Sequence, residues 1–263
     1  MGRGRDMDEE LAARLAEVNE SFYRENASSF SDTRHAAWPG WERCLADAGV
    51  GAGEAGRLAV LDVASGNLRF FDCLAKGVDV EHVDYDAVDS CDELARAGSQ
   101  AARARVRYQR LDVVGALLGG ELERSLDCSE HDLCVCFGFF HHVPTARLRL
   151  DLLRALLAKT RPGGTCCVSL WRFMEEPTLA ARARATTAEA ASELGIEEDR
   201  LGDDDYLLGW QGKGGAWRYC HSFSNEDAAG LAEGVCDQAR LRDDFLSDGR
   251  SGELNRYLVF ERR

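Results

Sequence analysis

Short apolar runs that alternate with stretches of helical pattern constrain this sequence more than any other feature. The runs are largely continuous rather than alternating, as expected for strands that helices cover on both faces. Strand and helix in turn along a chain are typical of βαβ units on a parallel sheet. The sequence therefore predicts an α/β fold, with strands at 58–63, 78–83, 106–111, 133–138 and 165–171.

Composition and charge narrow the class of protein. Of the 263 residues, 45% are hydrophobic, which supplies one domain with a full core and excludes disorder as the main state. The formal net charge of -14 argues against wide, unaided wrapping of nucleic acid, because a basic footprint supplies most of that attraction. A local basic patch remains open.

Neither a membrane span nor a signal peptide is expected. No apolar stretch approaches the roughly 18 residues that a span requires, and the start, MGRGRDMDEE, has basic residues with no apolar segment behind them. These features predict a soluble protein in the cytoplasm, with no membrane partner.

The ten cysteines stand inside apolar runs, singly or as the pairs Cys134/Cys136 and Cys166/Cys167. No CxxC pair occurs, so the spacing of zinc ligands is absent. We expect buried thiols in a reducing compartment, without disulfides and without a metal site.

The alternation breaks at 172–222, where an alanine-rich helical piece, an acidic loop and a glycine-rich turn follow one another. We expect this segment to be an insertion rather than a linker. One domain is therefore predicted, made of an N-terminal helical lid at 1–50, a core at 57–171, the insertion as a cap over the substrate, and a last helix with two strands at 223–263.

The segment LAVLDVASGNLRFFDCL predicts a strand, a tight turn and a helix at the start of the sheet, where doubly wound folds bind nucleotides. Asp62 ends the strand, Ser65 and Gly66 let the backbone approach a ligand, and the helix start offers unsatisfied N–H groups. A dinucleotide dehydrogenase is the nearest alternative, but it needs a fuller GxGxxG motif.

Two further acids fit a nucleotide site. Asp84 lies 18 residues after Gly66, at the predicted end of the next strand, where an acid accepts hydrogen bonds from ribose hydroxyls. Asp112 ends the third predicted strand, where a carboxylate can accept from an adenine amino group. Each acid alone could instead cap a helix.

With these acids the sequence resembles the class I S-adenosylmethionine-dependent methyltransferases from about Asn19 to the end. The resemblance implies a Rossmann-like, seven-stranded, mostly parallel sheet with helices on both faces and an antiparallel last strand. Ala64 and Leu68 depart from the family, which usually has glycine at both positions. We expect Ala64 to have a negative φ. We expect Leu68 to be the residue that begins the helix. S-adenosylmethionine is the implied cofactor, S-adenosylhomocysteine its product, and the implied contacts are Asp62, Ala64, Ser65, Gly66, Asn67, Asp84, Tyr85, Asp112, Val113 and Phe137.

Segments outside the cofactor core resemble a narrower family, the tRNA wobble-uridine carboxymethyl methyltransferases, which esterify the carboxylate of 5-carboxymethyluridine. Its pattern F-S-x-T-R-x-x-x-W-P is matched by Phe30, Ser31, Thr33, Arg34, Trp38 and Pro39, and its pattern R-Y-x-H-x-F by Arg218, Tyr219, His221 and Phe223. The resemblance makes tRNA a candidate acceptor. It also makes a small activator protein a candidate partner, because the eukaryotic enzymes work with a zinc-containing one.

Ester formation fits these residue types. A carboxylate is already a nucleophile at neutral pH, so it needs positioning more than a base, and arginine binds carboxylates bidentately. Arg34 and Arg218 are therefore the candidate positioning residues, although Arg34 could form a surface ion pair and the aromatic residues around Arg218 could merely anchor the insertion. For a hydroxyl or amine acceptor, His141, His142 or His221 could be the base. His142 and His221 complete the set of acceptor-side candidates.

Two other functions remain open. The acidic charge favours a small-molecule O- or N-methyltransferase, since the arginine runs before the third strand and along the helix after the fourth are more typical of solvated helix faces. The substitutions at Ala64 and Leu68 would suit a catalytically silent scaffold, against which the retained acids argue.

Overall fold

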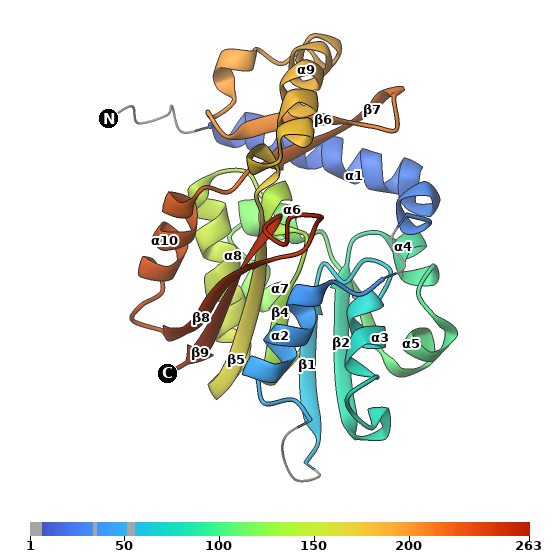
Figure 1. The fold of residues 1–263 in the computed structure, drawn as a ribbon, viewed down its shortest axis with the longest axis vertical. Helices are drawn as coiled ribbons and strands as arrows, with labels where there is room; N and C mark the ends of the chain where they lie inside the picture. The colour runs from blue at the N-terminus through green and yellow to red at the C-terminus, as the bar shows by residue number, and fades with distance from the viewer. Residues whose placement is uncertain (1–6, 34–35, 52–55) are drawn as a thin grey trace.

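The computed structural model describes residues 7–33, 36–51 and 56–263. Its centre is a seven-stranded sheet of order β3-β2-β1-β4-β5-β9-β8 (Figure 1). The strands from β3 to β5 are parallel, and β9 is antiparallel to both β5 and β8, which confirms the predicted fold class. The strands are β1 (Leu58–Val63), β2 (Val83–Asp89), β3 (Arg107–Arg110), β4 (His131–Cys136), β5 (Thr160–Trp171), β8 (Ala239–Ser247) and β9 (Asn255–Arg262).

Helices cover both faces of this sheet. Figure 1 shows α2 in front of β1, α3 beside β2, and α8 and α10 beside β4, β5 and β9. Side chains alternate along each strand, so that neighbouring residues join different cores: Cys166 packs with α8 and α10, and Cys167 packs with α2 and α3. The helices are α1 (Glu9–Ser31), α2 (Pro39–Asp47), α3 (Arg69–Leu74), α4 (Asp92–Arg96), α5 (Gln100–Arg105), α6 (Val113–Leu118), α7 (Leu122–Ser125), α8 (Ala146–Ala158), α9 (Pro177–Leu194) and α10 (Asn225–Glu233).

The insertion after β5 forms a layer over the carboxyl edge of the sheet. Its helix α9 packs on a hairpin of β6 (Asp205–Trp210) and β7 (Lys213–His221), and α1 crosses the same hairpin (Figure 1). Leu11 and Leu15 of α1 are buried with Ala190 of α9 and Tyr219 of β7. The cap is therefore built from the N-terminal helix α1 together with the insertion.

The second strand lies later in the chain than the sequence predicts. Residues 80–82 form a 3-10 turn, in which the side chain of Asp79 accepts from the backbone N of Glu81, and β2 follows as Val83–Asp89. Three of the seven residues of β2 are aspartates, and two of them pair with arginines at the start of the strand. Because β2 contains these aspartates, the search for apolar runs placed the strand too early in the chain.

The cysteines fill the core as expected. All but Cys128 and Cys236 are buried, and burial raises the pKa of the Cys134 thiol to about 12. Such thiols are protonated and act as small apolar side chains.

Candidate functional site

The loop between β1 and α3 is the centre of the candidate site. Asp62 is buried at the end of β1, and the Tyr85 hydroxyl donates to its Oδ2 at 2.7 Å. Burial raises the pKa of Asp62 to about 7, although the hydrogen bond from Tyr85 lowers it. Ser65 follows with a buried Oγ that has no hydrogen-bond partner among the described residues. Because buried hydroxyl groups are normally hydrogen-bonded, this one suits a hydrogen bond to a ligand atom.

Two residues of this loop adopt conformations that the sequence did not predict. Ala64 has φ of +62° instead of a negative value, and Leu68 has φ of +60° and precedes the helix, which begins at Arg69. Both lie in the left-handed region, where a residue with a Cβ is strained by about 1–2 kcal/mol. Glycine would adopt this conformation at both positions without that strain.

These two positions give a first prediction. Ala64→Gly raises the free energy of unfolding by about 0.5–1 kcal/mol, because relief of strain exceeds the extra entropy of glycine in the unfolded chain. Leu68→Gly lowers it by about 2–4 kcal/mol, because Leu68 is only 1% exposed. Urea unfolding of both variants measures the two effects, and equal signs would contradict the argument.

Asp89 is the acid at the carboxyl end of β2, and the structure corrects the placement of Asp84. Asp89 is buried and lines the cavity, where its Oδ2 accepts from the backbone N of Gly66 at 2.8 Å and its Oδ1 from that of Cys91 at 2.8 Å. Asp84 lies at the opposite end of the strand and pairs with Arg57 at 2.6 Å. Tyr85, its neighbour, is buried in the core and lines neither cavity.

Asp112 caps α6 and also borders the site. Its Oδ1 accepts from the backbone N of Gly115 at 2.9 Å, so the capping alternative is correct. Asp112 and Val113 line a small cavity of about 50 Å³ that shares Tyr23 and Asp89 with the main one. The other carboxylate oxygen of Asp112, Oδ2, can accept a hydrogen bond from a ligand beside this cavity.

The main cavity has a volume of about 630 Å³ and lies between the carboxyl edge of the sheet, the lid and the cap. The predicted residues Asp62, Ala64, Ser65, Gly66, Asn67 and Phe137 line it on the sheet side, and His142 and Arg218 line it on the cap side. Arg34, the remaining predicted residue of the lid, lies outside the described part of the chain. The structure thus brings predicted cofactor residues and predicted acceptor-side residues to the wall of one cavity.

The lid helix α2 is fixed against the β8–β9 turn. The backbone N of Gly40 donates to Oδ1 of Asp248 at 3.0 Å, and a Cβ at Gly40 would lie 2.2 Å from the ring of Tyr257. Only glycine permits this approach. The contact brings Trp38 and Trp41 to the wall of the cavity.

Arg218 is the most unusual residue on the cap side. It is 7% exposed, and its guanidinium lies 5.4 Å from the ring centroids of Phe22 and Trp210 and 5.7 Å from that of Trp171. Among the residues that the structure describes, no carboxylate lies within ion-pair distance of it, and its Nε has no hydrogen-bond partner. A buried cation without an acid is costly, so this position suits an anionic ligand.

Hydrogen bonds at both ring nitrogens hold His142 inside the cavity wall. Its Nδ1 lies 2.9 Å from the carbonyl oxygen of Tyr219 and donates to it, so Nε2 accepts from the hydroxyl of Tyr23 at 2.7 Å. His141, His142 and Cys220 also form a group of potential metal ligands among the described residues. Both ring nitrogens of His142 are engaged in hydrogen bonds, so His142 could bind a metal only by giving up one of them.

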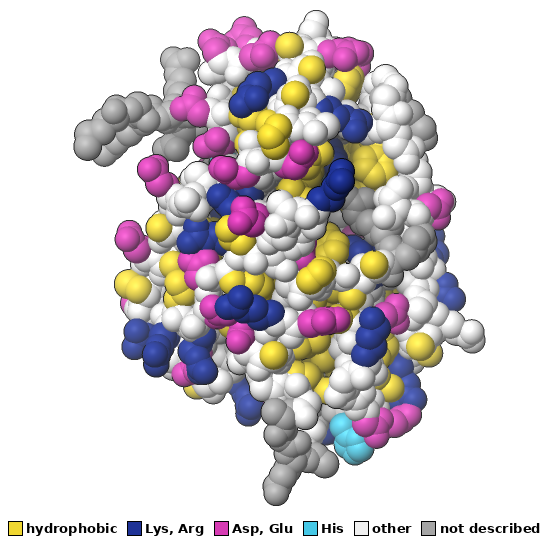
Figure 2. Space-filling model, viewed as in Figure 1, with side chains coloured by type: hydrophobic (Ala, Val, Ile, Leu, Met, Phe, Trp, Pro, Cys, Tyr) yellow, Lys and Arg dark blue, Asp and Glu magenta, His cyan; other side chains and the backbone are white. Residues whose placement is uncertain are grey.

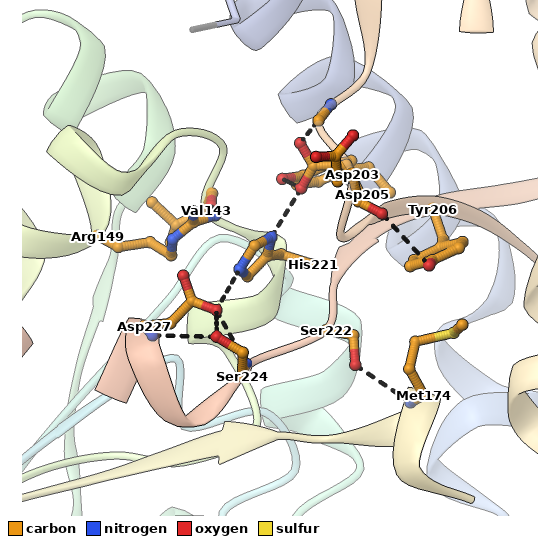
Figure 3. A network of polar contacts seen from close by, with 12 residues as sticks. Val143, Arg149, Met174, Asp203, Asp205, Tyr206, His221, Ser222, Ser224 and Asp227 are labelled. Carbon is orange, nitrogen blue, oxygen red and sulfur yellow. Dashed lines mark hydrogen bonds and ion pairs between the residues drawn. The ribbon is translucent and has the colours of Figure 1, made fainter. Parts of the chain in front are cut away.

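His221 belongs to an ion-pair network outside the cavity, which corrects its predicted place on the acceptor side. Figure 3 shows it between Asp205 and Asp227, at 2.8 Å from Oδ1 of Asp205 and 3.5 Å from Oδ2 of Asp227. It lies three residues beyond Arg218 on β7, and side chains an odd number apart point to opposite faces of a strand. His221 therefore ties the cap to α10.

This network gives a second prediction, on stability against pH. Burial lowers the pKa of His221, but the bonds to Asp205 and Asp227 outweigh burial and the net pKa is raised. The pair's stabilisation is therefore complete below the unfolded pKa of histidine, about 6.5, and is lost as pH rises through the folded value. The partner carboxyls have lowered pKa values, so their contribution is lost as pH falls below about 4.

We expect His221→Gln to lower the free energy of unfolding by about 3 kcal/mol at pH 5.5, because it leaves the buried carboxylate of Asp205 and the partly buried one of Asp227 without a cation, and by less at pH 8.5. Urea unfolding at the two pH values measures the difference. A loss that grows with pH would contradict the charged pair.

Comparison with solved structures decides the fold family. A 1,6-didemethyltoxoflavin-N1-methyltransferase from Burkholderia thailandensis, solved with S-adenosylhomocysteine, matches with a TM-score of 0.57 and 17% identity, over 96% of this chain and 90% of that one. The chain has the class I S-adenosylmethionine-dependent methyltransferase fold. A second methyltransferase of this kind, from Methanosarcina mazei, matches with a TM-score of 0.54 and 14% identity, over 79% and 92% of the two chains.

Curated relatives support the narrower resemblance. The chain is 28% identical over 171 residues to the tRNA (carboxymethyluridine(34)-5-O)-methyltransferase ALKBH8 of Macaca fascicularis, which covers 65% of this chain and 22% of that protein. The protein of the same name from Mus musculus is 29% identical over 154 residues, or 59% and 20% of the two chains. The chain thus matches about a fifth of the length of these relatives. No family model matches it.

The cavity wall includes residues that the sequence argument did not single out, among them Asp89, Tyr23 and Arg69. A signal existed for Asp89, which directly follows the apolar Ala87 and Val88 and so marks the strand's carboxyl end.

In the described part of the chain, no helix is both long and apolar enough to cross a bilayer.

Proposed function

We propose that this chain methylates a carboxylate oxygen, with S-adenosylmethionine as methyl donor and Arg218 as the residue that binds the acceptor carboxylate. The buried guanidinium of Arg218, which faces the cavity without an acid partner among the described residues, carries the proposal. Arginine binds carboxylates through two parallel hydrogen bonds. The surrounding rings of Phe22, Trp171 and Trp210 exclude water from that bond and strengthen it.

The sheet side of the cavity fits the cofactor. Asp89 and Asp112 offer carboxylate oxygens to ribose hydroxyls and to an adenine amino group, and Ser65 offers an unused hydroxyl. When bound, S-adenosylmethionine supplies an electrophilic methyl group, which an ionised carboxylate can accept without losing a proton. The contribution of Arg218 is then to orient one carboxylate oxygen toward the donor.

The finer proposal is that the acceptor is the 5-carboxymethyl group of a tRNA wobble uridine. It is supported by the curated relatives and by the two sequence patterns, since Phe30 and Trp38 of the first pattern and Arg218 of the second line the same cavity. Aromatic side chains around an arginine also suit a nucleobase turned out of its stack. Figure 2 shows Lys and Arg scattered among Asp and Glu on the face that it draws, so we expect tRNA binding to depend on a partner such as the family's activator subunit.

A small-molecule O- or N-methyltransferase is the second candidate. The hydroxyl of Tyr23 donates to His142, and both line the cavity, so this pair could remove a proton from a phenol or amine. Such a reaction would show a limb in the histidine range of its pH–rate profile, and ester formation would show none.

The test combines binding and transfer. Calorimetric titration with S-adenosylhomocysteine shows whether the cofactor site is intact, and absence of binding would leave only the silent scaffold. The protein is then incubated with cell lysate and S-adenosylmethionine that carries a labelled methyl group. After the reaction the lysate is separated into tRNA and small molecules. We expect label in tRNA; label confined to small molecules would contradict the tRNA acceptor.

A further inference from the structure

Arg69 is a second cation on the cavity wall, on the side opposite to Arg218. It is the first residue of α3, directly after the left-handed Leu68, and it lines the cavity beside Ser65 and Gly66. Among the described residues, no acid lies within ion-pair distance of its guanidinium. Burial lowers its pKa to about 10, so it still carries its charge at neutral pH.

The environment of Arg69 orients its guanidinium but does not neutralise it. Its Nε donates to Oδ1 of Asn67 at 3.0 Å and its Nη1 to the carbonyl oxygen of Ala36 at 2.8 Å. The guanidinium lies 5.5 Å from the ring centroid of Trp38 and 5.2 Å from that of Trp41. These contacts leave Nη2 without a hydrogen bond in the described part of the chain.

A second donor on the same wall also lacks an acceptor. Trp41 is 3% exposed, and its Nε1 has no partner among the described residues. Two donors with no acceptor, one of them charged, indicate an anionic oxygen ligand at this end of the cavity. The acids that line the cavity are Asp62, Asp89 and Asp248. They are already engaged with the Tyr85 hydroxyl, with backbone N–H groups and with the Tyr257 hydroxyl, respectively.

We infer that Arg69 binds the carboxylate at the amino-acid end of the cofactor, an inference that rests on the proposed cofactor. Two carboxylates enter the proposed reaction, one on the cofactor and one on the acceptor, and among the described residues the cavity wall has two guanidinium groups, those of Arg69 and Arg218, without an acid partner. Arg69 is on the sheet and lid side, next to the β1–α3 loop, whereas Arg218 is on the cap. Each arginine thus serves one carboxylate.

Binding of two ligands to variants of the full chain tests this assignment. The probes are S-adenosylhomocysteine and its decarboxylated analogue, which keeps the amino group and the adenosine. We expect wild-type protein to prefer S-adenosylhomocysteine by about tenfold or more, the usual weight of a charge-assisted bond. Arg69→Gln removes this preference, Arg69→Lys retains part of it, and Arg218→Gln leaves it unchanged.

The ratio of the two affinities separates the ligand role from a structural one. If Arg69 only anchors the lid, Arg69→Gln weakens both ligands equally and the ratio stays at its wild-type value, which overturns the inference. A ratio that collapses in Arg218→Gln instead also overturns it. Equal binding of both probes to wild-type protein overturns this inference alone, whereas no binding of either probe removes the proposed function as well.

Discussion

Replacing Arg218 by glutamine lowers kcat/KM for methyl transfer to a carboxylate acceptor roughly 100- to 1000-fold, the usual cost of losing a buried, charge-assisted contact. Binding of S-adenosylhomocysteine changes by less than about twofold, because Arg218 lies on the cap side of the cavity. Arg218→Lys keeps the charge but not the planar pair of donors, so we expect an intermediate rate. Steady-state kinetics with labelled cofactor and calorimetry measure both effects.

Arg149→Gln is the matched control for this experiment. Arg149 is also buried, lies 5.6 Å from the ring centroid of Phe223 and donates to the carbonyl oxygen of Val143, but it does not line the cavity. Its loss should lower stability and leave kcat/KM nearly unchanged. An equal loss of activity in both variants would show that Arg218 acts only by supporting the cap.

Replacing Asp89 by asparagine weakens binding of S-adenosylhomocysteine roughly 100-fold, because two charge-assisted bonds to the ligand weaken at once. The same change disturbs the loop, because Oδ2 accepts from the backbone N of Gly66 and Oδ1 from that of Cys91, and in asparagine an NH2 group, which can only donate, replaces one of these oxygens. We therefore also expect the free energy of unfolding to fall by about 1–3 kcal/mol.

Asp84→Asn is the control on the same strand. This variant loses exposed ion pairs with Arg57 and, at 3.9 Å, with Arg107, each of which is worth at most about 1 kcal/mol. Its affinity for S-adenosylhomocysteine should stay within about twofold of wild type. If Asp84→Asn weakened binding and Asp89→Asn did not, the ribose site would lie where the sequence spacing placed it.

The fold was predictable because it rests on patterns that sequence records directly. Apolar runs of strand length, helices between them and an insertion after the fifth strand specify a parallel sheet with its site at the carboxyl edge. The loop with Asp62, Ser65 and Gly66 follows from the same reasoning. Each of these three residues lines the cavity.

Other parts of the site depend on geometry that residue spacing does not record. Asp84 satisfied a spacing rule, but the ends of β2 are set by its pairing with β1, which places Asp89 at the carboxyl edge instead. Arg218 and His221 share one sequence pattern, yet the alternation of β7 separates them. The positive φ of Ala64 was missed because tertiary packing, rather than residue preference, holds that loop.

The chemical nature of the methylated product tests the central proposal most directly. Purified protein, with any partner it requires, is given S-adenosylmethionine with a labelled methyl group and tRNA that carries 5-carboxymethyluridine, and the product is treated with mild alkali. A methyl ester releases its label as methanol, and we predict that nearly all of the label transferred by wild-type protein is released and that Arg218→Gln transfers almost none. Label that survives alkali would place the methyl group on nitrogen, carbon or an ether oxygen and would contradict methylation of a carboxylate.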